Sequence, residues 1–215
     1  MNVAALMLGL AAGGFAVGDW WAVARDRRRL EYVCKPAATL ALLGAAATLG
    51  GAPEPTHTWF VVALALCLVG DVFLMLPEGG AHYWFVPGLG AFLLAHVAFT
   101  VGFAARGVSG DRLAIGAALI VVVAGPLAAR FVRALRRAGQ GALVGPVLAY
   151  LIAIGATATT AVGAGDGWGI AGAWLFVASD ALIAETRFVG ARRGAPAAIM
   201  VTYYLALAGL VASLH

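Results

Sequence analysis

The chain has 215 residues, of which 63% are hydrophobic and 11% are charged, and its formal net charge is +4 at pH 7. Soluble globular domains average roughly 45–50% apolar and about 25% charged residues, so this composition excludes an ordinary water-soluble domain and indicates a protein whose solvent is the lipid bilayer. The cations lie in short clusters between apolar runs, which favours membrane topology over nucleic-acid binding as their explanation.

The apolar residues fall into eight runs, each about as long as a membrane-spanning helix requires. The first run lacks the positive stretch and the cleavage pattern of a signal peptide, and we expect it to remain as a permanent span. The sequence therefore predicts an all-α polytopic membrane protein, with residues 1–215 forming one transmembrane helical bundle. The predicted spans are residues 2–21, 34–50, 57–76, 83–105, 113–131, 142–163, 168–188 and 195–214.

The basic residues predict how the spans are oriented. Twelve of the 14 Lys and Arg residues lie at the loops after the first, fifth and seventh spans, and the opposite side holds only Arg106 and Arg112. By the positive-inside rule, the twelve-cation side is cytoplasmic and both termini are non-cytoplasmic. A missed or invented span would move the later clusters to the other side, so the asymmetry also supports the number of spans.

Three aspartates lie within the predicted spans, where a charge costs roughly 2.5–3.5 kcal/mol on insertion scales. Asp19 is near the inner end of its span, and we expect it to pair with the basic cluster at Arg25–Arg29. Asp71 and Asp180 have no arginine within a turn along their helices, so a functional role is the favoured interpretation. Small residues precede both, Gly70 and Ser179, and would allow close helix contacts that exclude lipid.

Other polar side chains lie at similar depth. Lys35 is predicted to open the second span just before Pro36, either snorkelling to the headgroups or entering a cavity. His96 is either a link between helices or a site residue. Tyr203 and Tyr204 diverge by about 100° on a helix, so at most one should face a shared cavity fully. Because alternate spans run in opposite directions, these groups are all expected in the cytoplasmic half, where seven helices converge on one polar cavity. The candidate supporting residues are Lys35, His96, Tyr150, Ser179, Tyr203 and Tyr204.

Two carboxyls in a low-dielectric site favour acid–base chemistry. Desolvation and mutual repulsion let one stay protonated as an acid while the other acts as a base that activates water, which suits hydrolysis through an oxocarbenium-like cation. A zinc site is less favoured, since His96 is the only histidine deep in a span. Nucleophilic catalysis by Ser179 is weakly supported, because helical neighbours such as Asp180 diverge from it.

The order and spacing of several short motifs over nearly the whole chain resemble those of the TMEM86/YhhN family of membrane lysoplasmalogenases. The residues that carry this resemblance are Lys35-Pro36, Gly70-Asp71, Leu74, Phe85, Gly88, Phe92, Ala95-His96, Tyr150, Phe176, Ser179-Asp180 and Tyr203-Tyr204.

The resemblance implies a hydrolase of the cell (plasma or inner) membrane that cleaves the vinyl ether bond of a lysophospholipid, without cofactor or metal, from the cytoplasmic leaflet. Asp71 and Asp180 are then the expected acid and base, with the order of their roles left open. The alternatives are a small proton- or cation-coupled transporter of lipids or solutes, and another intramembrane hydrolase that depends on aspartates.

Overall fold

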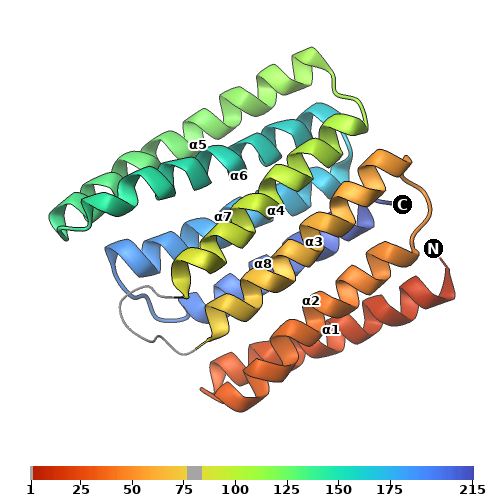
Figure 1. Cartoon of the computed structure of the whole chain (residues 1–215), viewed down its shortest axis with the longest axis horizontal. Coiled ribbons are helices and arrows are strands. Elements are labelled where there is room, and N and C mark those ends of the chain that lie inside the picture. The colour runs from red at the N-terminus through yellow and green to blue at the C-terminus, as the bar shows by residue number, and fades with distance from the viewer. Residues whose placement is uncertain (1, 77–83) are drawn as a thin grey trace.

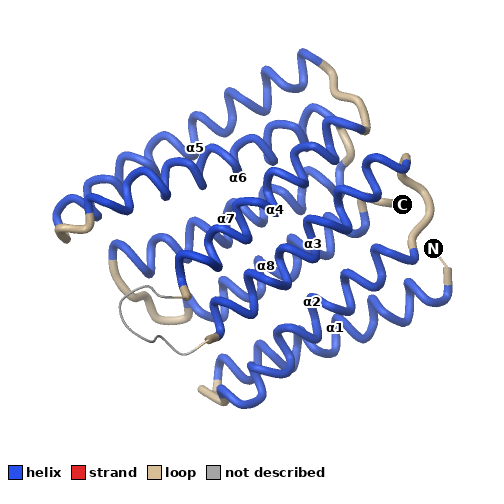
Figure 2. The backbone as a smooth tube through the Cα atoms, in the orientation of Figure 1, coloured by secondary structure: helices blue, strands red, loops and turns tan. Residues whose placement is uncertain are grey.

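The computed structural model describes residues 2–76 and 84–215, and helix makes up nearly all of this part of the chain (Figure 2). It contains eight long α-helices, a 3₁₀ turn and a short π-helix. The bounds are α1 Val3–Ala24, α2 Arg28–Thr48, α3 Glu54–Met75, α4 Phe85–Ala105, α5 Gly110–Arg137, η1 Gly141–Leu143, α6 Val144–Ala164, α7 Gly167–Ala184, η2 Glu185–Val189 and α8 Ala195–Ala212.

The helices form one bundle in which the chain crosses back and forth, and both termini lie at the same end (Figure 1). Helix α8 has a central position in the bundle, where it packs against α1, α2, α3 and α7. Helix α4 packs against α3 and α6, whereas α5 lies at the outside and packs mainly on α6. Side chains from distant parts of the sequence therefore meet around α3, α4, α7 and α8.

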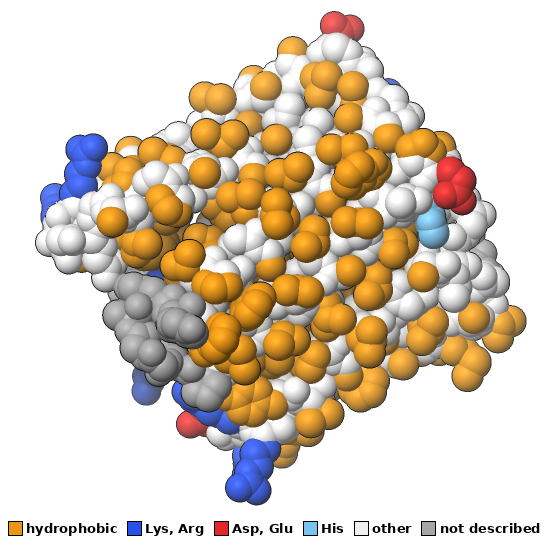
Figure 3. All heavy atoms as spheres, in the orientation of Figure 1, with side chains coloured by type: hydrophobic (Ala, Val, Ile, Leu, Met, Phe, Trp, Pro, Cys, Tyr) orange, Lys and Arg blue, Asp and Glu red, His pale blue; other side chains and the backbone are white. Residues whose placement is uncertain are grey.

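Seven of the helices are long and apolar enough to cross a bilayer, which makes the chain a multi-pass membrane protein. Helix α2 does not qualify, because its first two turns carry Arg28, Arg29, Glu31 and Lys35. The surface over the middle of the bundle is hydrophobic, and the Lys and Arg side chains gather mostly at the end away from the termini (Figure 3). The assignment of that basic end to the cytoplasm remains a prediction from the positive-inside rule.

Two helices extend further into the basic end than the apolar runs predict. Helix α5 continues to Arg137, and α2 begins at Arg28. Arginine is a good helix former whose long side chain reaches the headgroups from inside a span, so charge ends the apolar run without ending the helix. The start of the fourth span, predicted at Tyr83, lies outside the described residues.

The early start of α2 corrects the prediction for Lys35, which lies two turns inside the helix and not at its N-terminus. Helix α2 passes through Pro36 without ending. Proline removes the hydrogen bond to the carbonyl four residues earlier, and that residue, Tyr32, is 41% exposed. The freed carbonyl therefore lies where water or lipid headgroups can satisfy it.

Glycines allow the helices around the site to approach closely. A Cβ atom on Gly172 of α7 would lie 2.8 Å from the carbonyl oxygen of Ala206 on α8. A Cβ atom on Gly70 of α3 would lie 2.6 Å from the Phe92 ring of α4. Close backbone contact of this kind drives helix association in lipid, and it brings the polar side chains of neighbouring helices within hydrogen-bonding distance.

Candidate active site

Asp71 is the centre of a first polar network. Its carboxylate, 1% exposed, accepts hydrogen bonds at Oδ2 from the hydroxyls of Thr39 on α2 and Tyr203 on α8, each 2.7 Å long. The ammonium of Lys35 lies 3.5 Å from Oδ1. Lys35 and Thr39 are four residues apart and so share one face of α2. One cation and two hydroxyl donors surround this carboxyl and favour its ionised form, whereas its burial favours the neutral form.

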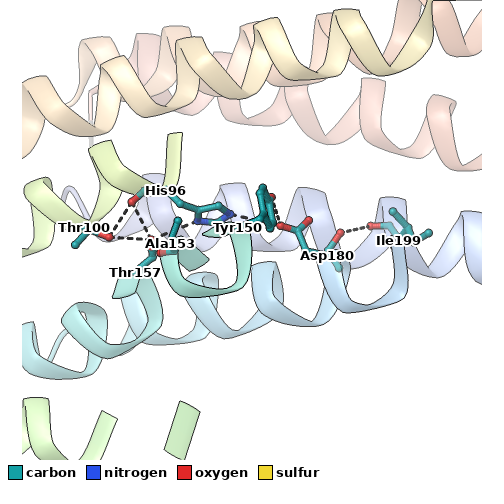
Figure 4. Close-up of polar contacts among 8 residues, drawn as sticks. His96, Thr100, Tyr150, Ala153, Thr157, Asp180 and Ile199 are labelled. Atoms are coloured by element: carbon teal, nitrogen blue, oxygen red, sulfur yellow. Dashed lines mark hydrogen bonds and ion pairs between the residues drawn. The ribbon is translucent and has the colours of Figure 1, made fainter. Parts of the chain in front are cut away.

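Asp180 is the centre of a second network, drawn in Figure 4. Its Oδ2 accepts a hydrogen bond from the Tyr150 hydroxyl of α6 and lies 3.4 Å from Nε2 of His96 on α4. On the other side of the imidazole, Nδ1 lies 3.3 Å from the Thr157 hydroxyl of α6. The side chain of His96 is fully buried and that of Asp180 is 13% exposed. Lys35, the only cation in the two networks, does not contact Asp180.

Asp19 is the centre of a third cluster, and the prediction that it pairs with the basic cluster is wrong. The residue is fully buried, and its Oδ2 accepts a hydrogen bond of 2.9 Å from the Tyr204 hydroxyl of α8. Oδ1 and the indole nitrogen of Trp20 have no hydrogen-bond partner among the described residues. Asp19 lies more than a turn inside the helix end and faces α8, so the arginines at that end do not reach it.

The two tyrosines of α8 diverge, as the helical geometry requires. Both are nevertheless buried against acidic groups, because Tyr203 binds Asp71 while Tyr204 binds Asp19. The two tyrosines thus bind different aspartates, which agrees with the expectation that at most one of them faces a shared cavity fully. Helix α8 contacts two acidic helices on adjacent faces.

Aromatic rings separate the polar networks. Phe176 of α7 lies between them, with its ring centroid 4.6 Å from that of His96 and 5.6 Å from that of Tyr203. Within the described ranges no hydrogen bond or ion pair joins Asp71 to Asp180, although both interact electrostatically with the buried Cys67. The single polar cavity predicted from the sequence is thus divided into neighbouring networks.

The remaining candidate, Ser179, supports the packing of two helices. Its hydroxyl is buried and donates a hydrogen bond of 3.2 Å to the carbonyl of Ile199 on α8. It contacts neither carboxylate, so its place in the structure is to hold α7 against α8 beside Asp180. Thr39, Thr157 and Phe176 also belong to the site, although the sequence does not predict them as polar site residues. Helical spacing relates Thr39 to Lys35, whereas only the fold brings Thr157 to His96.

Two cavities adjoin these networks. The first lies between α4, α5, α6 and α7 and is apolar, with Asp180 the only charged group among its described lining residues. The second, a groove at the basic end, is the larger of the two and is lined by charges of both signs. Those charged residues are Asp26, Arg28, Glu31, Lys35, Arg187 and Arg192.

The apolar cavity and the charged groove meet at shared walls, since Leu74, Phe85 and Ile183 line both. Near the groove, Glu185 forms ion pairs with Arg130 of α5 and with Arg192, at nitrogen–oxygen distances of 2.6 and 2.8 Å. The two cavities together form an amphipathic site, polar toward the headgroup level and apolar within the bundle. Among the described residues no group of three His, Cys, Asp or Glu residues could hold a metal ion.

Comparison with known proteins agrees with the resemblance seen in the sequence. The model of the YhhN family matches residues 30–214. A protein of Mycobacterium bovis named lysoplasmalogenase is 34% identical over 203 residues, covering 84% of this chain and 75% of the relative, and one from Mycobacterium tuberculosis matches equally well. Human lysoplasmalogenase TMEM86B is 29% identical over 180 residues, covering 72% of this chain and 75% of its own length.

No solved structure matches the chain. The family match covers most of its length and both networks, from Lys35 to Tyr203. The chain therefore belongs to the YhhN family.

Proposed function

We propose that this member of the YhhN family hydrolyses the vinyl ether bond of lysoplasmalogens, releasing a fatty aldehyde and a glycerophospho-headgroup product. Two kinds of observation support the proposal: the names of the relatives, and the amphipathic shape of the site. The observation that carries it is the position of Asp180, a carboxyl in the wall of an apolar cavity that adjoins a charged groove.

The two cavities suit the two parts of a lysophospholipid. The alkenyl chain, which is hydrophobic, binds in the apolar cavity between α4 and α7. The phosphate binds in the groove, where Arg28, Lys35 and Arg192 supply positive charge. With the basic end on the cytoplasmic side of the cell membrane, the substrate enters from the cytoplasmic leaflet.

The two carboxyls supply the acid and the base. Asp180, which has no cation beside it, donates a proton to the outer carbon of the vinyl ether, and the double-bond electrons form the new C–H bond. The product of this step is an oxocarbenium ion at the carbon bonded to oxygen. Tyr150 and His96 hold the Asp180 carboxyl at the cavity wall during the transfer.

Asp71, whose ionised form is favoured by the neighbouring Lys35, accepts a proton from the water that attacks the oxocarbenium ion. The hemiacetal then collapses: Asp71 returns its proton to the departing glycerol oxygen, and the hemiacetal hydroxyl gives its proton to Asp180. Both carboxyls recover their starting states, so the cycle closes with the net consumption of one water. Lys35 lines the groove and contacts Asp71, which supports a water route from the groove to this carboxylate.

The proposal is tested with purified protein in liposomes and three substrates that share a headgroup: a lysoplasmalogen, its saturated alkyl ether and an acyl lysophospholipid. We expect fatty aldehyde from the first and no cleavage of the other two. In D₂O the aldehyde should carry one deuterium on the carbon next to the carbonyl, because that carbon is protonated. Release of fatty acid from the acyl substrate, or turnover of the saturated ether, would contradict the proposed chemistry.

A further inference from the structure

Thr157 on α6 is a buried residue that contacts His96 and lines neither of the two cavities described above. Its Oγ1 lies 2.9 Å from the carbonyl oxygen of His96, 3.2 Å from that of Ala153 and 3.3 Å from Nδ1 of the His96 ring (Figure 4). A threonine hydroxyl has one proton to donate and two lone pairs to accept with. Its Oγ1 also lies 3.1 Å from the hydroxyl of Thr100, which itself donates to the carbonyl of His96 at 2.8 Å. A carbonyl oxygen only accepts, so we assign the proton of Thr157 to its shortest contact, the same carbonyl of His96.

This arrangement fixes the state of the imidazole. With its proton committed to a carbonyl, Thr157 meets Nδ1 as an acceptor, and Nδ1 therefore carries a hydrogen. Nε2 then faces Oδ2 of Asp180 at 3.4 Å. Without a further proton, two lone pairs would face each other at this contact. One proton shared by the imidazole and the carboxyl removes that conflict and leaves the buried pair with no net charge, which the apolar surroundings favour.

The same contacts direct the acidic proton of Asp180 toward the substrate. Oδ2 already faces both Tyr150 and His96, whereas Oδ1 has no hydrogen bond or ion pair among the described residues and belongs to the side chain that lines the apolar cavity. The shared proton lies between Nε2 of His96 and Oδ2 of Asp180; once it resides on the carboxyl, rotation about the Cβ–Cγ bond carries the protonated oxygen to the position of Oδ1, on the side of the apolar cavity. We propose that Thr157 is a positioning residue that fixes the Nδ1–H tautomer of His96, so that the His96–Asp180 pair stores the proton used in the reaction. This inference rests on the proposed function.

The first test measures pH profiles of aldehyde release for Thr157→Val and Thr157→Ser. Valine has the shape of threonine but leaves Nδ1 without an acceptor, so the imidazole adopts the Nε2–H tautomer, which donates to Asp180 and favours its carboxylate. In Thr157→Val we expect kcat to fall by about tenfold or more with KM within about twofold of the native value. The alkaline limb of the pH profile of kcat should move to lower pH by about one to two units. Thr157→Ser should keep the native kcat and the native pH profile.

The titratable groups that face the His96–Asp180 pair are the same in every variant: Tyr150 from α6, Cys67 from α3, and the Asp71–Lys35 pair beyond Tyr203. Thr160→Val is the matched control, because Thr160 donates only to carbonyls of its own helix, those of Ala156 and Thr157. Equal losses in the valine and serine variants, or a valine variant with the native pH profile, would overturn the inference.

A second measurement does not depend on activity. Nitrogen-15 NMR of histidine-labelled protein in liposomes, with His96→Gln used to assign the signal, reports which ring nitrogen of His96 is protonated. We expect Nδ1–H in the native protein and Nε2–H in Thr157→Val. A native protein that carries its hydrogen only on Nε2 would overturn the assignment. Absence of aldehyde release together with Nδ1–H would refute the proposed function and leave the tautomer assignment standing.

Discussion

Gly70 is the residue whose substitution tests the geometry of the site most directly without touching a polar group. A Cβ atom at this position would lie 2.6 Å from Cδ2 and Cε2 of the Phe92 ring. Ordinary carbon–carbon contact requires about 3.5 Å, so in Gly70→Ala the ring must move by roughly 1 Å. Phe92 lines the apolar cavity and packs edge-on against Phe176 and Tyr203, so any movement changes the cavity or the ring that holds Asp71.

The size of the effect follows from two opposing contributions. Overpacking typically costs about 1–3 kcal/mol, whereas replacing glycine by alanine in a helix gains about 0.8–1.0 kcal/mol. We therefore expect Gly70→Ala to be destabilised by up to about 2 kcal/mol and to lose aldehyde release at unchanged expression. Gly90→Ala on α4 is the control: nothing lies within 4 Å of its added Cβ, so it should be neutral or slightly more stable.

The assay is equilibrium unfolding in mixed detergent micelles together with aldehyde release on the same preparations. Phe92→Ala removes both atoms that clash, so the double variant Gly70→Ala/Phe92→Ala should lose less stability than the two single changes added together. Equal stability and activity in Gly70→Ala and Gly90→Ala would refute the reasoning. So would a double variant whose losses are simply additive, because the Phe92 ring would then not be the source of the cost.

Three further predictions concern the carboxyls, the topology and metals. Asp71→Asn and Asp180→Asn should each lower kcat by about 10²–10⁴-fold with normal membrane insertion. Asp111→Asn, at an exposed position in the first turn of α5, is the control and should match the native enzyme. Native turnover in either of the first two variants would refute the proposed acid–base pair. A thiol reagent that does not cross membranes should label Ala138→Cys only from the cytoplasmic side and Ser109→Cys only from outside, and the reverse pattern would invert the orientation. Aldehyde release should survive dialysis against EDTA, and loss that is restored by a divalent cation would require a metal in the mechanism.

The bundle follows from the sequence largely because its apolar runs have a length set by the bilayer. Eight runs predict eight spans; in the described part of the chain eight long helices form, of which seven are long and apolar enough to cross a bilayer, and both termini lie at one end. The boundaries at the basic end are less predictable. Arg133 and Arg137 end an apolar pattern but continue α5, since an arginine side chain reaches the headgroups from within a helix.

The partners of the polar residues depend on helix rotation and packing, which apolar runs do not encode. Asp19 lies near a basic cluster in sequence, yet it turns toward Tyr204 because α1 packs against α8. Thr157 carries no signal in the sequence that relates it to His96, since the two meet only where α4 crosses α6. Sequence reasoning therefore identifies which polar residues are buried better than it identifies which of them meet.

The difference in surroundings between Asp71 and Asp180, on which their proposed roles rest, is an instance of this dependence on packing. Both are single carboxyls in apolar helices, preceded by a small residue, and the sequence offers no reason to distinguish them. The fold does so by placing Lys35 two turns inside α2, beside Asp71. One carboxyl thereby gains a cation that favours its charge, while the other faces an imidazole, a phenol and an apolar cavity. A cation beside one carboxyl and no Lys or Arg beside the other is the kind of difference that the proposed acid and base require, and here a single lysine supplies it.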